Sequence, residues 1–212
     1  MMTLIKVLLV DDHAIVREGY QRLLANEPGV EVVGEAANAL AACECALALR
    51  PDVVVMDIAL PGMSGIEATR RMLKDRSQLR ILMFSMHDDA IYATRALEAG
   101  ALGYLSKASA PEVLMQAIQA VSRGVRYVSE DVAANLARLT EQRGKSDLEA
   151  LTPREFEVLR LLLRGETVRS IGERLGLSEK TVANHQTAIR EKLGTRNTVQ
   201  LSRLAEQHGL CP

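Results

Sequence analysis

The feature that most constrains the fold of this chain is a regular alternation of two residue patterns between residues 5 and 123. Short apolar runs rich in β-branched residues alternate with longer segments in which apolar residues recur at helical spacing. The short runs are Ile5–Val10, Val30–Gly34, Val53–Met56, Ile81–Phe84 and Gly103–Leu105, and the helical segments are Ala14–Ala25, Ala39–Leu49, Ile66–Leu73, Ala90–Ala99 and Pro111–Ser122. Alternating strands and helices form βαβ units, and strands that are apolar throughout are typical of a parallel sheet covered on both faces. The first part of the chain is therefore predicted to be an α/β domain with a doubly wound, five-stranded parallel sheet.

A second kind of organisation begins after about Gly124, where strand patterns no longer occur. Residues 129–142 can form one further helix, and the polar segment Glu141–Asp147 is predicted to be a linker. Four short helices are then predicted near residues 153–164, 168–175, 179–193 and 198–207. The first of them has Thr152 as its N-cap, with Glu155 placed to complete a capping box. The predicted division is an α/β domain over residues 1–124, a linker with a helix over 125–147, and an all-α four-helix domain over 148–212.

Composition restricts the classes of protein to which the chain can belong. With 48% hydrophobic and 25% charged residues, it is predicted to be globular rather than disordered. No apolar run approaches the roughly 18 residues that cross a bilayer, and the carboxylates of Asp11 and Asp12 come too early for a secretory signal. We therefore expect a cytoplasmic protein with no membrane contact. Residues 148–212 carry 10 basic and 8 acidic residues, against 16 and 19 in the rest of the chain, which weakly favours a nucleic-acid partner for the C-terminal part.

Charged and hydroxyl residues follow four of the predicted strands at their carboxyl ends, where ligands bind in sheets of this kind. They are Asp11 and Asp12 after the first strand, Asp57 after the third, Ser85 after the fourth and Lys107 after the fifth. Each alone is more often a cap, a turn residue or a solvated side chain, but five at one edge of a sheet indicate a site. Clustered carboxylates need a cation, and ligands that are all oxygen suit a hard ion such as Mg²⁺.

The segments LLVDDH, MDIALPG, FSM and GYLSK contain these residues and resemble the sequence blocks of response-regulator receiver domains, over about residues 4–123. The resemblance implies a flavodoxin-like fold in which Asp57 accepts a phosphoryl group from a cognate sensor histidine kinase. It further implies that Asp12, Asp57 and the backbone carbonyl of Ala59 ligate Mg²⁺, with Asp11 acting through water.

The same resemblance implies that Lys107 contacts the phosphoryl oxygens and that Ser85 and Tyr104 form a switch pair. A carboxylate that attacks phosphorus forms an acyl phosphate, which by analogy with other phosphorylated side chains adds roughly −1.5 to −2 charge. Ser85 can then donate to a phosphoryl oxygen, and Tyr104 can turn into the space that is vacated. No catalytic residue is expected beyond this site, so the chain is predicted to catalyse only its own aspartyl phosphorylation and dephosphorylation.

Residues 168–193 have the pattern of a helix, a tight turn and a second helix. Gly176 can end the first helix in the left-handed conformation, and Ser178 can cap the second. Within the second helix, Val182, Ile189 and Leu193 fall on one stripe and are predicted to be core residues.

The opposite side of this second helix is polar and carries small or amide side chains, which allow close approach to base edges. The segments LTPREFEVLRLLLRG and LSEKTVANHQTAIREKLG resemble the LuxR-type helix-turn-helix over about residues 148–206, and with the receiver-like part in front the whole chain resembles the NarL/FixJ class. The resemblance implies a recognition helix over Ser178–Leu193 that binds double-stranded DNA, and a homodimer when the protein is phosphorylated. The residues predicted to contact DNA are Lys180, Thr181, Ala183, Asn184 and Thr187.

The C-terminal part departs from the LuxR-type pattern at a few positions. Ala183 and Thr187 stand where relatives often carry basic residues, which predicts weaker attraction to phosphate. Gln186 lies toward the core stripe, where an apolar residue is more usual. Gly172 replaces the commoner alanine, at a cost of about 1 kcal/mol in helix propensity.

Three alternatives to a phosphorylation-controlled transcription regulator follow from the residues. A Mg²⁺-dependent phosphatase would use similar aspartates, but it also needs an acid/base and a substrate-binding cap, and no inserted segment is large enough to form one. A regulator that binds DNA without phosphorylation is disfavoured by the intact set of Asp11, Asp12, Asp57, Ser85 and Lys107. The C-terminal helices alone would fit a small protein-interaction bundle equally well.

Overall fold

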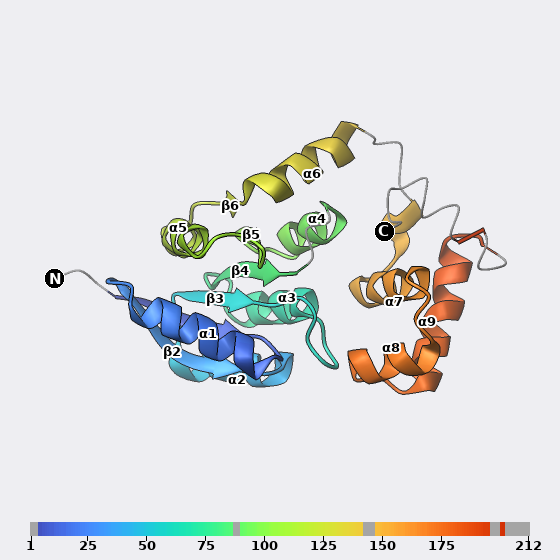
Figure 1. Cartoon of the computed structure of the whole chain (residues 1–212), viewed down its shortest axis with the longest axis horizontal. Coiled ribbons are helices and arrows are strands. Elements are labelled where there is room, and N and C mark those ends of the chain that lie inside the picture. Colours follow the sequence, from blue (N-terminus) through green and yellow to red (C-terminus); the bar gives the residue numbers. More distant parts are fainter. Residues whose placement is uncertain (1–3, 87–89, 142–146, 196–199, 202–212) are drawn as a thin grey trace. The chain divides into compact units, whose positions relative to one another are not determined.

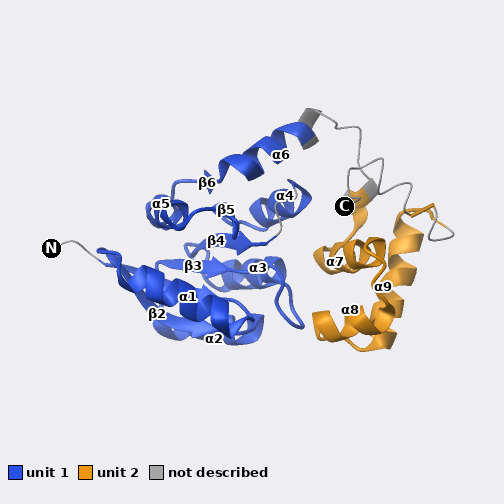
Figure 2. Ribbon diagram, viewed as in Figure 1, with its two compact units in different colours: residues 1–141 blue, residues 142–212 orange. Residues whose placement is uncertain are grey.

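The computed structural model describes residues 4–86, 90–141, 147–195 and 200–201 (Figure 1). The chain divides into two compact units, residues 1–141 and residues 142–212 (Figure 2). Within the described ranges, no helix is both long and apolar enough to cross a bilayer.

Unit 1 is an α/β domain built on one parallel sheet with the strand order β2-β1-β3-β4-β5-β6. Its strands are β1 (Ile5–Val10), β2 (Val30–Ala36), β3 (Val53–Met56), β4 (Arg80–Ser85), β5 (Gly103–Ser106) and β6 (Tyr127–Val128). Its helices are α1 (Ala14–Ala25), α2 (Ala39–Leu49), α3 (Gly65–Asp75), α4 (Ala90–Glu98), α5 (Pro111–Ser122) and α6 (Glu130–Glu141). The doubly wound parallel fold is therefore confirmed, and it places the carboxyl ends of β1, β3, β4 and β5 side by side.

The central strands are buried because helices cover both faces of the sheet, as their continuously apolar sequences predicted. Leu24 of α1 and Ile118 of α5 pack into one core with β-strand residues such as Val55 and Leu82. Helices α2, α3 and α4 pack side by side in sequence order, as expected for the layer on the other face.

The sheet has six strands rather than the five that were predicted, which is a correction to the sequence analysis. Strand β6 has only two residues, pairs in parallel with β5 and was assigned to the linker, because a two-residue strand has no detectable period. Helix α6 was predicted as part of that linker, but it belongs to unit 1, packs against α4 and buries Val132 completely.

Unit 2 is helical in the residues that the structure describes: a 3₁₀ turn (Asp147–Ala150), α7 (Pro153–Leu163), α8 (Val168–Leu175) and α9 (Glu179–Lys192). The predicted capping box is confirmed, because Thr152 Oγ1 accepts from the Glu155 amide and Glu155 Oε2 accepts from the Thr152 amide at 2.7 Å. Gly176 ends α8 in the left-handed conformation (φ 64°), and Ser178 caps α9. The fourth predicted helix, near 198–207, lies outside the described residues except for Gln200 and Leu201, which are helical.

Candidate functional site

Backbone hydrogen bonds at the strand ends bring three of the predicted site residues to one edge of the sheet. The amide of Asp11 donates to Ala36 at the end of β2 at 3.1 Å, and the amide of Asp57 donates to Val10 at the end of β1 at 2.9 Å. The amide of Lys107 donates to the carbonyl of Ser85 at 2.8 Å. The parallel ladders therefore fix the main chain from which the charged side chains project.

A buried ion-pair network joins these residues. Lys107 Nζ contacts Asp57 Oδ2 at 2.7 Å and also binds Asp11 Oδ2, and all three side chains are less than a tenth exposed. Burial raises the pKa of Asp57, although Lys107 opposes this shift. Burial alone would lower the pKa of Lys107, but Asp57 and Asp11 outweigh it and raise that pKa, so the amine remains charged. Two carboxylates against one ammonium leave a net negative charge, which favours a further cation.

Asp12 and His13 extend the acidic cluster toward solvent. His13 Nδ1 lies 2.8 Å from Asp12 Oδ1 and 3.3 Å from Asp11 Oδ1, and the His13 amide donates to Asp11 Oδ1 at 2.9 Å. One ligand atom from each of Asp11, Asp12 and His13 can be chosen so that all lie within 4.8 Å of one another. The carboxylate oxygens fit a hard divalent cation. The sequence analysis gave His13 no role, and the available signal was its position directly after the paired aspartates.

The turn after Asp57 is held tightly against the end of β3. The amide of Ile58 donates to Asp57 Oδ1 at 2.7 Å, and the amide of Gly65 donates to the carbonyl of Ile58 at 2.9 Å. A Cβ atom on Gly65 would lie 1.9 Å from the Asp57 carbonyl oxygen, so only glycine fits at the start of α3. Ala59, predicted to offer its carbonyl to the cation, is half-buried in this turn.

The predicted switch residues lie on neighbouring strands. Ser85 ends β4, Tyr104 is on β5, and both side chains are fully buried. The carbonyl of Tyr104 accepts a hydrogen bond from the amide of Ser129 at 3.2 Å, just before α6 begins. The tyrosine therefore occupies an inward position in this structure, and its main chain is connected to α6.

In unit 2, the two sides of α9 differ as predicted. Val182, Ile189 and Leu193 are buried, which confirms the core stripe. On the other side, Lys180, Ala183, Asn184 and Thr187 are exposed, as predicted for residues that contact DNA.

The hydroxyl groups on this side of α9 already have partners in the helix. Thr181 is half-buried, and its Oγ1 lies 2.8 Å from the Ser178 hydroxyl at the start of α9. Thr187 Oγ1 donates to the carbonyl of Ala183 at 3.1 Å. Of the five residues predicted to contact DNA, Lys180 and Asn184 are therefore the two whose exposed polar groups are not engaged in such hydroxyl hydrogen bonds.

The turn between α8 and α9 explains why residue 172 is glycine. A Cβ atom there would lie 2.7 Å from the carbonyl oxygen of Leu177, and the Gly172 carbonyl itself accepts from the Leu177 amide at 2.8 Å. Because residue 172 is glycine, the main chain of Leu177 can come close to α8. The sequence analysis considered only the poor helix propensity of glycine and did not predict this contact. Gln186 is half-buried at the edge of the core stripe.

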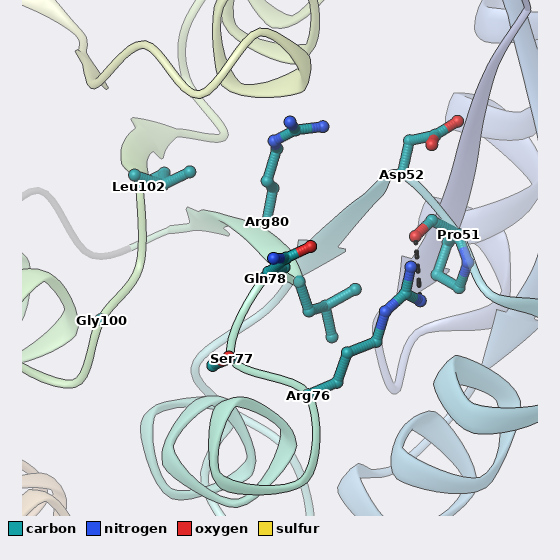
Figure 3. Close-up of a pocket in the computed structure, with 9 residues that line it drawn as sticks. Pro51, Asp52, Arg76, Ser77, Gln78, Arg80, Gly100 and Leu102 are labelled. Carbon is teal, nitrogen blue, oxygen red and sulfur yellow. Dashed lines mark hydrogen bonds between the residues drawn. The ribbon is translucent and has the colours of Figure 1, made fainter.

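A separate polar hollow of about 440 Å³ lies at the amino ends of β3, β4 and β5, and Figure 3 shows Arg76, Arg80 and Asp52 around it. Arg76 follows the last residue of α3 and donates to the carbonyl of Pro51 at 3.5 Å. Cations at the C-terminal ends of helices are favoured by the partial negative charge of the terminal carbonyls. The position of Arg76 at the C-terminal end of α3 therefore accounts for a positive charge there. The hollow lies at the opposite edge of the sheet from Asp57.

Comparison with known proteins identifies the families to which both parts of the chain are similar. The family model of the response regulator receiver domain matches residues 7–119, and that of the bacterial regulatory proteins of the luxR family matches residues 149–205. Response regulator UvrY of Escherichia coli (strain K12) is 37% identical over 210 residues, which cover 98% of this chain and 96% of that protein. Response regulator GacA of Pseudomonas aeruginosa (strain PAO1) is 38% identical over 209 residues, 98% of both chains.

Solved structures of response regulators are also similar to this chain. RcsB from Salmonella enterica serovar Typhimurium, bound to the promoter rprA in the presence of the phosphomimetic BeF₃⁻, is 28% identical with a TM-score of 0.66, over 96% of this chain and 99% of that one. A LuxR-family response regulator from Aurantimonas sp. SI85-9A1 is 47% identical with a TM-score of 0.64, over 66% of this chain and 99% of that one. The chain therefore belongs to the two-component response regulators of the NarL/FixJ class, in which a receiver domain is followed by a LuxR-type helix-turn-helix domain.

Proposed function

We propose that this response regulator binds DNA under the control of phosphorylation at Asp57. The observation that carries the proposal is the buried contact of 2.7 Å between Lys107 Nζ and Asp57 Oδ2, at the edge where Asp11 also lies. An Asp57 oxygen attacks the phosphorus of a phosphohistidine or a small phosphodonor, the bond from phosphorus to the donor atom breaks, and an aspartyl phosphate forms. Lys107 remains charged and offsets the negative charge of the transferred group.

Mg²⁺ is the cation that we propose for this site, because its ligands would all be oxygen atoms. Asp12, Asp57 and the backbone carbonyl of Ala59 would hold it, with Asp11 acting through water. When bound, the ion offsets charge on the phosphoryl oxygens. The chain's own contribution is to aim the carboxylates, through the Ile58 amide at 2.7 Å from Asp57 Oδ1 and the His13 amide at 2.9 Å from Asp11 Oδ1.

Signal transmission is proposed to begin at Ser85 and Tyr104. The Ser85 hydroxyl donates to a phosphoryl oxygen, which draws the end of β4 toward Asp57 and favours the inward position of Tyr104. Tyr104 is fully buried and its carbonyl is bonded to the Ser129 amide, so a shift of β5 is passed to α6.

DNA recognition is proposed to reside on the exposed side of α9, with Asn184 and Thr187 reading bases, Lys180 contacting phosphate, and Thr181 and Ala183 lying against the groove. Because the Thr187 hydroxyl donates its hydrogen to the Ala183 carbonyl, Thr187 would read a base by accepting a hydrogen bond at Oγ1. We propose a homodimer as the DNA-bound form, because one small domain buries too little surface for strong specificity and paired half-sites multiply affinity. The partners would be a sensor histidine kinase and double-stranded DNA, and the setting the cytoplasm.

The test is incubation of the full chain with acetyl phosphate, with and without Mg²⁺, followed by intact mass and by selection of bound sequences from random DNA. We expect the mass of one phosphoryl group to be added only when Mg²⁺ is present, and the phosphorylated protein to retain DNA more tightly. If the chain gains no mass, phosphorylation does not control it. A mass gain without any change in DNA retention would reject the proposal that phosphorylation controls DNA binding. It would still support Asp57 as the acceptor.

A further inference from the structure

Arg17 of α1 contacts the main chain of the acidic site, and neither the sequence patterns nor the proposed phosphoryl transfer assigns it a role. Its Nη1 donates to the backbone carbonyl of Asp11 at 2.6 Å, and its Nε lies 3.3 Å from Glu35 Oε2 on β2. The Arg17 side chain is only 17% exposed. One guanidinium group therefore links the first helix to the ends of two strands.

The bonded carbonyl belongs to the peptide group that connects Asp11 to Asp12. A peptide group is planar, so fixing the direction of its carbonyl also fixes the plane that leads into Asp12. The Asp11 amide is held on the other side by Ala36 at 3.1 Å. With Arg17 bonded, both peptide groups that flank the Asp11 Cα atom are anchored, and with them the direction of its Cα–Cβ bond. The next peptide group, which flanks Asp12 on its other side, is held by the bond of 2.9 Å from the His13 amide to Asp11 Oδ1.

We propose that Arg17 is a positioning residue of the cation site: it holds the Asp11–Asp12 peptide group so that both carboxylates face the metal. The inference rests on the proposed binding of Mg²⁺ at this edge of the sheet. A charge-assisted hydrogen bond at 2.6 Å is of the strong kind. The planar guanidinium donates along two fixed directions at once, which a lysine cannot do.

Electrostatics and positioning predict opposite effects when this arginine is removed. A positive charge close to carboxylates weakens their attraction for a cation, so loss of the charge alone would tighten Mg²⁺ binding. Loss of a group that orients metal ligands typically weakens metal affinity by about 10- to 100-fold. The direction of the change in affinity therefore separates the two roles.

The experiment measures Mg²⁺ affinity by titration calorimetry and by the amide NMR signals of Asp12 and His13, with no phosphodonor present. We expect Arg17→Met to bind Mg²⁺ about tenfold more weakly than the natural sequence. Arg22→Met is the matched control: Arg22 is on the same helix, its side chain is 77% exposed, and it pairs with Glu18. This control should leave the affinity unchanged or slightly tighter.

Arg17→Lys keeps the positive charge but cannot donate in the two fixed directions of a guanidinium group. Its affinity for Mg²⁺ should therefore lie between those of the natural sequence and Arg17→Met. It also serves as the informative variant if Arg17→Met does not fold, because electrostatics alone predicts no change for it. At saturating Mg²⁺, phosphorylation by acetyl phosphate should return to nearly the natural rate in the folded variants, since Arg17 touches no reacting atom.

Unchanged or tighter Mg²⁺ binding in Arg17→Met, or unchanged binding in Arg17→Lys when only that variant folds, would overturn the inference. If the natural sequence itself binds no Mg²⁺ at millimolar concentration, the proposed cation site fails instead. The two failures are therefore distinguishable in the same titration.

Discussion

At the scale of single residues, the Asp57 carboxylate is engaged at both of its oxygens within a buried site. Ile58 donates to one oxygen and Lys107 to the other, each at 2.7 Å. Such an arrangement leaves little freedom for the carboxylate and directs it toward the edge of the sheet where a phosphodonor can approach.

Asp57→Asn should therefore abolish the mass gain from acetyl phosphate and Mg²⁺, because an amide is not a competent nucleophile although it has the same shape. Intact mass measures the result. Asp52→Asn is the control, since Asp52 is exposed at the opposite edge of the sheet and accepts from the Lys6 amide at 2.8 Å. An unaltered mass gain in Asp57→Asn would move the acceptor to another residue.

Two neighbouring residues of α9 should have separable roles in DNA binding. Asn184→Ala is expected to change preference at one base position by ~1–3 kcal/mol, because an amide can bond two atoms of one base. Lys180→Ala should weaken binding to all sequences alike and flatten the dependence on salt, because a phosphate contact carries no sequence information. Selection from random DNA and salt titrations measure both effects. If the selected site is the same for Asn184→Ala as for the natural sequence, the assignment of this face is wrong.

At the scale of elements, close backbone contacts fix how helices begin beside the site. Gly65 starts α3, and a Cβ atom there would lie 1.9 Å from the Asp57 carbonyl oxygen. Because the obstructing atom belongs to the main chain, it cannot move aside as a flexible side chain would.

Gly65→Ala should therefore destabilise the protein by more than about 2 kcal/mol and slow phosphorylation, since the end of β3 has to shift. Gly19→Ala is the control within α1, where nothing lies within 4 Å of the added atom. The helix propensity of alanine should make this variant more stable by about 0.5–1 kcal/mol. Urea unfolding followed by circular dichroism compares the two, and equal stability of Gly65→Ala and the natural sequence would contradict the close contact.

Helices α7 and α9 are joined by a charged contact that depends on pH. Both oxygens of Glu155 accept from Lys192 Nζ, at 2.7 and 2.9 Å. Burial alone would raise the pKa of Glu155, but the hydrogen bonds from Lys192 and Thr152 outweigh it and lower the pKa below its ordinary value of 4.5. Since the pKa is lower in the folded state, this carboxylate stabilises the fold fully above pH 4.5 and less as the pH falls through the folded-state value.

Glu155→Gln retains a capping-box side chain and loses the charge. Because Lys192 is about a third exposed and screened by solvent, the expected loss is only about 0.5–1 kcal/mol near pH 7. The difference from the natural sequence should shrink below pH 4.5, which hydrogen exchange of the α7 amides at matched pH can follow. Glu173→Gln, in an exposed pair with Arg169, should show neither effect. A difference that persists undiminished at pH 3 would exclude the charge as its cause.

At the scale of the whole molecule, phosphorylation should promote a dimer that places two helix-turn-helix domains on paired half-sites. Affinity then rises because binding of the second domain becomes intramolecular. Sedimentation of the full chain with beryllofluoride and Mg²⁺, with and without DNA, measures the association. Asp57→Asn provides the control that cannot respond. A strict monomer at micromolar concentration in every condition would count against the dimer.

Much of this protein follows from local sequence patterns, because strands, helices and caps depend on residues close together in the chain. The apolar runs predicted five of the six strands, and Thr152, Gly176 and Ser178 were placed correctly at helix ends. The acidic residues could be assigned to one edge because strand ends meet there in any parallel sheet. Their detailed roles came from the resemblance to receiver domains and await the experiments above.

Tertiary structure alone decided the contacts between residues far apart in the chain. Lys107 lies 50 positions from Asp57 and Arg17 lies 18 positions from Glu35, so no local period connects either pair. Strand β6 is too short to have a pattern and exists only because β5 offers an edge. Sequence patterns report which face a residue occupies, whereas a bond between two side chains also depends on the distance between their elements, which packing of the whole domain sets.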